Sequence, residues 1–157
     1  MGSLYQLRRK QRVNGNLRET WNFFSNPQNL PLITPPALGL QLLTKDLADK
    51  MHKGQIIEYK LTPLFRIRLY WKTEITAVQE EEYFCDEQMS GPYSLWKHEH
   101  FFKDIDGYVE ITDIIHYKLP YGILGDIAHA LIVKRKLQQI FDYRQQRVEE
   151  LFRKIEN

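Results

Sequence analysis

The segment of residues 84–125 constrains the fold most, because it combines three strand-like stretches with polar residues where a buried face would be apolar. Turns at Gly91-Pro92 and Asp106-Gly107 delimit a middle strand over residues 94–103. Side chains alternate between the two faces of a strand, so one face carries Trp96, His98, His100 and Phe102. Two imidazoles therefore stand between two large aromatic rings. Buried polar groups need hydrogen-bond partners or a ligand, so this face predicts a binding cavity.

The two neighbouring strands add polar side chains of matching parity. The preceding strand, over residues 83–89, carries Phe84, Asp86 and Gln88 on one face. The following strand, over residues 108–118, carries Asp113 and Tyr117 on one face together with two isoleucines. In an antiparallel sheet these side chains would surround the two histidines, which predicts a polar cluster on the cavity face.

The N-terminal part of the chain predicts a strand and two short helices. Residues 3–13 alternate weakly, and Asn14-Gly15 turns the chain. Asn16 stands three residues before Glu19, which is the spacing of a capping box at a helix start. The helix that follows ends before Pro27 and presents one apolar face made of Leu17, Trp21 and Phe24. Trp21 is interpreted as a core residue, and a second short helical turn is expected at about residues 28–33.

The remaining chain predicts more strands and a long closing helix. Strands are expected over residues 40–43, 55–61 and 65–78, the last of them long and cleanly alternating. After Pro120 and Gly122, a helix of roughly 30 residues, about 45 Å long, is expected. Its apolar positions recur at helical spacing: Ile127, Leu131, Leu137, Ile140, Phe141, Val148, Leu151, Phe152 and Ile155. Such a helix needs a large apolar surface, which here is the inner face of the sheet.

Composition sets the outer limits of function. The 157 residues are expected to form a single domain over 1–157, and the net charge of +2, with basic residues scattered among acids, argues against nucleic acid as a partner. One cysteine excludes an intramolecular disulfide and is compatible with a reducing compartment. No apolar run approaches the roughly 20 residues that span a bilayer, so no integral membrane segment is expected. A cytoplasmic location is the expectation, and the oligomeric state stays open.

The order of elements resembles the START-like, helix-grip superfamily, often grouped as SRPBCC, which includes polyketide cyclase/dehydrase-type and lipid-transfer members. The residues that carry the resemblance run Phe84-x-Asp86-x-Gln88-x-x-Gly91-Pro92-Tyr93-x-x-Trp96-x-His98-x-His100-x-Phe102, and they continue as Asp113-x-x-x-Tyr117-x-x-Pro120-x-Gly122-x-x-Gly125. This pattern is similar to that of bacterial SRPBCC ligand-binding proteins. The resemblance implies an α+β fold in which a curved seven-stranded antiparallel sheet wraps around a long C-terminal helix, with a hydrophobic cavity between them. It implies no particular reaction.

Four interpretations of the polar cluster stay open. His98 or His100 could act as a general base oriented by Asp113, with a tyrosine hydroxyl steadying an enolate. The His-x-His pair with a carboxylate could hold a metal ion, but that spacing is common by chance, so no metal and no cofactor are predicted. The cluster could instead be a self-satisfied network that fixes the register of the strands, or it could orient the polar head of a ligand without chemistry.

The predicted cavity wall combines aromatic and polar side chains: Tyr59, Phe65, Trp71, Phe84, Asp86, Gln88, Trp96, His98, His100, Phe102, Asp113 and Tyr117. The leading hypothesis is binding or carriage of a small hydrophobic molecule, such as a lipid, a polyketide or an isoprenoid-like compound, by a protein that is more readily a binder than an enzyme. One alternative is a cyclase or dehydratase that uses His98 or His100 with Asp113 as acid–base groups. Another is an interaction protein with a collapsed cavity.

Overall fold

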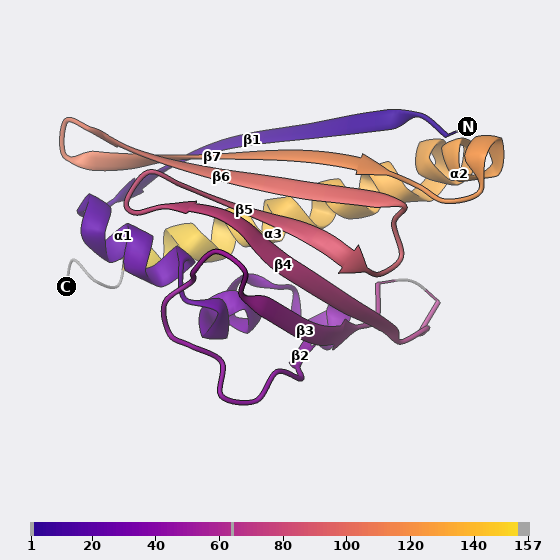
Figure 1. Cartoon of the computed structure of the whole chain (residues 1–157). Helices are drawn as coiled ribbons and strands as arrows, with labels where there is room; N and C mark the ends of the chain where they lie inside the picture. The colour runs from indigo at the N-terminus through magenta and orange to yellow at the C-terminus, as the bar shows by residue number, and fades with distance from the viewer. Residues whose placement is uncertain (1, 64, 154–157) are drawn as a thin grey trace.

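The protein is described by a computed structural model that covers residues 2–63 and 65–153. Seven strands form one antiparallel sheet in the order β1-β7-β6-β5-β4-β3-β2 (Figure 1). Consecutive strands from β2 to β7 are therefore neighbours in the sheet, and the first strand, β1, pairs with β7 at the opposite edge from β2. The strands are β1 (Leu4–Asn14), β2 (Gln41–Leu42), β3 (Ile56–Leu61), β4 (Leu69–Gln79), β5 (Tyr83–Ser90), β6 (Leu95–Ile105) and β7 (Tyr108–Lys118).

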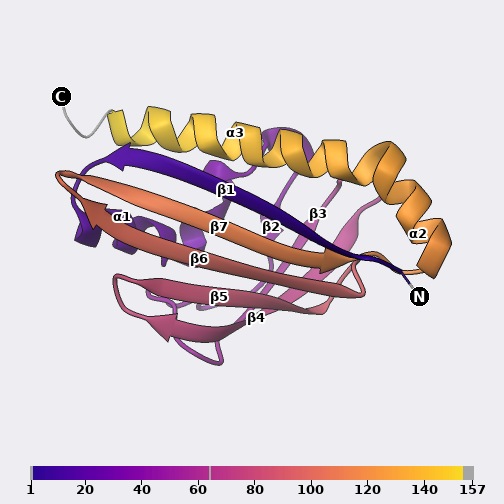
Figure 2. The same cartoon turned by 90° about the horizontal axis from the view of Figure 1, so that it is seen from above.

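Helices cover one face of this sheet. Between β1 and β2 lie the helix α1 (Leu17–Phe24) and two 3-10 helices, η1 (Pro27–Ile33) and η2 (Pro36–Leu38). After β7 the chain is helical without a break through α2 (Gly122–Ala128), the π-helical segment η3 (His129–Val133) and α3 (Lys134–Arg153). Figure 2 shows α3 lying along the length of the sheet, while β3 and β4 curve away from β1. The predicted helix-grip architecture is confirmed.

The local sequence signals account for most of the elements. The side chain of Asn16 accepts a hydrogen bond of 2.8 Å from the backbone N–H of Glu19, which confirms the predicted helix cap. The second helical turn is the 3-10 helix η1, in which two prolines limit the backbone donors. In β7 buried and half-buried residues alternate along the whole strand, as the period of two predicts. The predicted C-terminal helix is confirmed from Gly122 to Arg153, whereas its last apolar position, Ile155, lies outside the described residues.

The long predicted strand over residues 65–78 is wrong at its beginning. Strand β4 starts at Leu69, and residues 65–68 form a turn and loop instead. Phe65 and Arg66 have φ angles of 51° and 55°, which is the left-handed region and incompatible with an extended strand. Phe65 and Ile67 line the cavity described below, although they belong to no strand.

The filled part of the interior lies beside α1. Trp21 is 1% exposed, as a core residue should be, and its ring packs edge-on against Phe84 and Phe102. Val148 and Phe152 of α3 complete this aromatic cluster from the helix side. A second, smaller buried cluster joins β7 to α3 further along the helix, through Ile115, Tyr117, Leu137 and Phe141. Within residues 2–63 and 65–153, no helix combines the length and the apolar character needed to cross a membrane.

Candidate functional site

A cavity of about 580 Å³ lies between the sheet and the helices. Its wall is mostly apolar and comes from the inner faces of β3 and β4, from η1 and η2, and from α3. Phe65 and Leu124 belong to the wall and are 77% and 71% exposed, so the cavity opens between the loop before β4 and helix α2. Ligand sites typically measure about 300–1,000 Å³, so this space suits a small molecule.

The curvature of the sheet creates this space. Strand β4 shifts its register against β5 at two places, Lys72/Thr73 and Ile75/Ala77, and such bulges bend a strand and increase its twist. The inner side chains of β3 and β4, such as Ile57 and Trp71, therefore face α3 across a gap instead of packing directly on it. Helix α2 begins directly after β7, where Gly125 packs against the backbone of Pro120 with no room for a Cβ atom.

The structure separates the predicted site residues into two groups. The cavity wall includes these: Tyr59, Phe65, Trp71, Phe84, Asp86, Trp96, His98 and His100. Gln88, Phe102, Asp113 and Tyr117 do not line it. Gln88 instead holds the turn between β5 and β6, because its amide bonds the backbone of Tyr93 through both its oxygen and its nitrogen. Phe102 and Tyr117 belong to the two buried clusters, and Asp113 lies behind the histidines.

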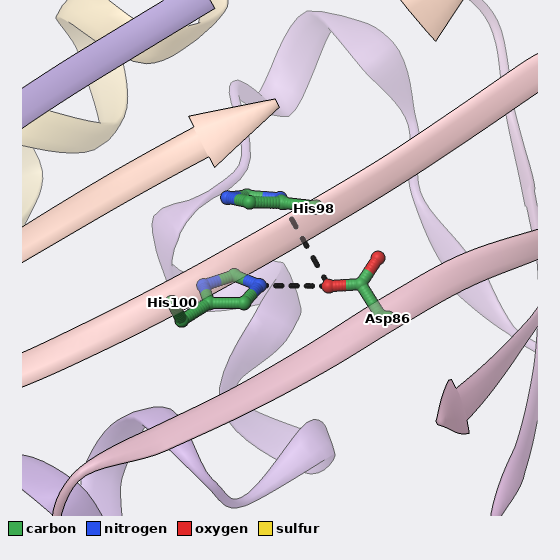
Figure 3. A group of neighbouring side chains, drawn as sticks. All are labelled: Asp86, His98 and His100. Carbon is green, nitrogen blue, oxygen red and sulfur yellow. Dashed lines mark hydrogen bonds and ion pairs between the residues drawn. The ribbon is translucent and has the colours of Figure 1, made fainter. Parts of the chain in front are cut away.

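The two histidines form a stacked pair between two carboxylates. Their ring centroids are 3.7 Å apart, as expected for residues two positions apart on the inner face of β6. At one end His98 Nε2 lies 2.8 Å from Asp113 Oδ1, and His100 Nδ1 lies 3.1 Å from the same oxygen. At the other end Asp86 Oδ2 lies 2.7 Å from His100 Nε2 and 3.9 Å from His98 Nδ1 (Figure 3). The Asp86 end faces the cavity and the Asp113 end does not.

The strand register explains why these four side chains meet. In the β5–β6 ladder Asp86 is opposite His98, and in the β6–β7 ladder Asp113 is opposite His100. Each carboxylate therefore reaches one histidine directly across the ladder and the other diagonally. The predicted cluster of His98, His100, Asp86 and Asp113 is brought together as its parity indicated. Among the described residues, His98 Nδ1 and His100 Nδ1 make no directed hydrogen bond, so the network does not satisfy itself completely.

Arg144 of α3 completes the cluster and was missed by the sequence analysis. Its guanidinium lies 3.8 Å from Asp113 Oδ1, over the rings of Phe24 and Phe141, and it also lines the cavity. Arg144 stands three residues after Phe141, on the apolar face of the helix, where a basic residue is unusual. A basic residue on the apolar face of the helix was therefore the sequence signal that could have identified Arg144 as part of the site.

The charges in the cluster compensate one another. Burial acts to raise the pKa of Asp113, but Arg144 and the two histidines outweigh it and hold that pKa well below its usual value. Burial also opposes ionisation of Asp86, whose pKa is nevertheless lowered by the hydrogen bond from His100. Burial lowers the pKa of His98, and the charge of His100 lowers it further, which favours a neutral ring. Burial acts in the same direction on His100, but its two carboxylate neighbours raise its pKa and favour the protonated form.

A second set of polar contacts joins β1 and β7 to the π-helical segment η3. The Nε2 atom of His129 lies 2.7 Å from the Tyr117 hydroxyl, and the His129 ring stacks on Tyr5 at 3.5 Å. Tyr5 donates a hydrogen bond of 2.8 Å to Asp126 of α2. These contacts fix the end of the long helix that borders the cavity opening. They position the site without contributing to its wall.

Comparison with solved structures agrees with this architecture. A START superfamily protein from Mycobacterium smegmatis matches with a TM-score of 0.68 and 9% identity, over 96% of this chain and 98% of that chain. The chain has the START-like, helix-grip fold. The ginseng major latex-like protein 151 from Panax ginseng matches with a TM-score of 0.68 and 14% identity, over 95% of this chain and 97% of that chain. A point mutant of norcoclaurine synthase from Thalictrum flavum, in complex with a transition-state analogue, matches with a TM-score of 0.66 and 16% identity, over 96% and 97% of the two chains.

These similarities concern the fold alone. No protein-family model matches the chain, and no curated protein matches its sequence. At identities of 9–16%, these matches show the helix-grip fold and carry no information about the side chains of the site.

Proposed function

We propose that the protein binds or carries a small hydrophobic molecule in the cavity between the sheet and α3, acting as a single domain in the cytoplasm. The observation that carries the proposal is the cavity itself, about 580 Å³ of largely apolar space with a few polar groups at one end. That combination of an apolar wall and few oriented polar groups is typical of small-molecule sites. It argues against the alternative of a collapsed cavity and a purely surface-based role.

The shape of the site indicates the kind of molecule. Trp71 stands at the centre of an aromatic wall, with its ring 5.9 Å from Tyr59 and 5.3 Å from Trp96. Aromatic walls offer large contact areas and favourable edge and face contacts to flat or branched apolar molecules. Asp86 and His98 at the inner end would meet a polar group of the ligand. A lipid, a polyketide or an isoprenoid-like compound with one polar end fits this arrangement.

Native mass spectrometry of gently purified protein tests the proposal, followed by denaturing extraction of any bound molecule. The expected result is a mass increase that disappears on denaturation, together with an extracted compound that is mainly apolar. The variant Trp71→Ala, which removes the central aromatic wall, should retain less of the compound than the wild type. A protein that carries no compound, and that takes up none from a panel of lipids, polyketides and isoprenoids, would contradict the proposal.

A second candidate function is acid–base catalysis, which one specific observation favours. His98 Nε2 lies 2.8 Å from Asp113 Oδ1, while His98 Nδ1 has no hydrogen bond among the described residues and its ring lines the cavity. A carboxylate that accepts one N–H of a neutral imidazole leaves the other nitrogen as a base. This is the arrangement that a cyclase or dehydratase would use to remove a proton next to a carbonyl. His98→Gln should then abolish turnover and leave apolar ligand affinity unchanged, whereas a pure binder shows no turnover to lose.

A further inference from the structure

We propose that His98, His100 and Asp86 form a binding site for one divalent transition-metal ion at the inner end of the cavity. Each of the three residues offers one ligand atom, and these atoms all lie within 4.8 Å of one another (Figure 3). The inference goes beyond the proposed function and does not depend on it, because a metal ion can be tested without knowing the organic ligand. It also revises the expectation from the sequence that no metal is bound.

The spacing of the ligand atoms suits a first-row ion. Metal–ligand bonds of about 2.0–2.2 Å at tetrahedral to octahedral angles place neighbouring ligand atoms about 2.8–3.6 Å apart. Asp86 Oδ2 lies 2.7 Å from His100 Nε2 and 3.9 Å from His98 Nδ1, so the two separations bracket the required value. Small rotations of the rings would therefore admit the ion. It would take the place of the hydrogen that His100 Nε2 shares with Asp86.

Asp113 orients the ring of His98 from the opposite side by a hydrogen bond, and its Oδ1 also lies beside His100 Nδ1. A metal-binding histidine usually donates its other N–H to a carboxylate, which fixes the ring and selects the free nitrogen. Asp113 Oδ1 lies 2.8 Å from His98 Nε2 and 3.1 Å from His100 Nδ1. This leaves His98 Nδ1 and His100 Nε2 directed toward Asp86. His98 and His100 are 5% and 4% exposed, and both lie in the cavity wall, so their free nitrogens are buried but open to the cavity.

The donor set selects the class of ion. Two imidazoles and one carboxylate suit Zn²⁺, Fe²⁺, Co²⁺ or Ni²⁺, whereas Ca²⁺ and Mg²⁺ prefer sets made only of oxygen. Three protein ligands on one side leave further positions that face the cavity, as in metal sites that bind a second molecule. A metal ion would also occupy the His98 Nδ1 lone pair that the acid–base candidate requires, so occupancy by metal and use of that nitrogen as a base exclude each other.

Titration of tag-free, chelator-treated protein with Co²⁺ and Zn²⁺ tests the inference. Calorimetry and the visible spectrum of bound Co²⁺ should show one ion per chain. The dissociation constant should be below about 10 µM, as is typical of specific metal sites in proteins. Asp113→Asn should weaken binding by about 10- to 100-fold, as expected when a residue orients the ligands. His98→Gln and Asp86→Asn should weaken binding more than this.

His116→Gln is the matched control, because His116 lies on the outer face of β7 and should leave binding unchanged. Circular dichroism establishes that each variant is folded. Should a variant fail to fold, ring-nitrogen NMR of the wild-type protein decides alone: Zn²⁺ should shift His98 Nδ1 and His100 Nε2 while His98 Nε2 keeps its hydrogen. Absence of saturable binding with a dissociation constant below about 10 µM would overturn the inference, since specific sites bind at least that tightly. Binding that survives in both His98→Gln and Asp86→Asn would also overturn it.

Discussion

The two ends of the interior are built from similar aromatic residues but are filled differently. Beside α1, Trp21 packs against Phe84, Phe102 and the side chains of α3, and it does not line the cavity. Toward α2, Trp71 faces a cavity of about 580 Å³ although it is also buried. Burial alone therefore does not distinguish a core residue from a residue of the cavity wall. Whether the opposite wall closes on a side chain depends on the curvature of the sheet and on the path of α3.

The polar cluster lies at the boundary between these two ends. Phe84 stacks on His100 at 4.0 Å from the filled side, and His98 meets Phe141 at 5.7 Å. The apolar filled end could not accept unpaired charges, and the open end could not hold the rings in place. The boundary supplies rigid aromatic support on one side and access to the cavity on the other. A preorganised site needs both.

The two ends of the interior should differ most in the free energy of unfolding that is lost when each of the two tryptophans is replaced by alanine. Trp21→Ala should lower the free energy of unfolding by about 3–5 kcal/mol, because it opens a void in close-packed structure. Trp71→Ala should lower it by only about 1–2 kcal/mol, because part of that ring already faces empty space. Urea denaturation measures both values. Equal losses in the two variants would show that the cavity end is packed as tightly as the core.

Replacing Asp113 tests whether a buried ion pair contributes more to stability than an exposed one. Asp113→Asn should lower the free energy of unfolding by about 3 kcal/mol, because it removes the carboxylate that pairs with Arg144 and leaves the buried cluster with one negative charge fewer. Asp142→Asn is the control: Asp142 pairs with Arg9 at 2.6 Å, but its side chain is 65% exposed. That control should lose less than about 1 kcal/mol. A loss at Asp113 as small as the control would mean that the cluster is solvated.

The smallest effect concerns pH and the contact of His129 with the end of β7. Burial, and then the charge of Lys134, lower the pKa of His129 below its usual value of 6.5. The unfolded chain therefore binds this proton more readily, so the stability contribution is complete above pH 6.5 and is lost as the pH falls through 6.5 toward the folded-state pKa. The free energy of unfolding should fall more between pH 7.5 and 5.5 in the wild type than in His129→Gln. Parallel pH profiles would contradict this.

The strands and the polar cluster were predictable because a period of two assigns each side chain to a face. In β7 the alternation runs through every residue, so the inward position of Asp113 followed from the sequence. The pairing of Asp86, His98 and Asp113 required only that three consecutive strands be antiparallel neighbours, which short turns make probable. The capping of α1 by Asn16 followed from a local hydrogen bond that needs no tertiary structure.

Periodicity assigns a side chain to a face of the sheet but does not tell what that side chain packs against. The features that the sequence did not predict depend on this packing. Phe102 and Trp71 both point inward, yet one is core and the other cavity wall, because bulges in β4 bend that part of the sheet away. The alternation over residues 65–68 indicated a strand, but the positive φ angles of Phe65 and Arg66 make it a loop. Arg144 and the π-helical segment at His129 follow from the packing of the helix on the finished sheet.

The central claim, that the open end of the interior is a site for an apolar molecule, is tested most directly by filling it. Ile57 is 3% exposed and points from β3 into the cavity, so Ile57→Trp should occupy part of the space. Ile114→Trp makes the same change on the outer face of β7. Titration with an apolar fluorescent probe should show one site per chain in the wild type and in Ile114→Trp, with at least about tenfold weaker binding in Ile57→Trp, equivalent to about 1.4 kcal/mol. Equal probe binding by both variants, with both folded, would contradict the account.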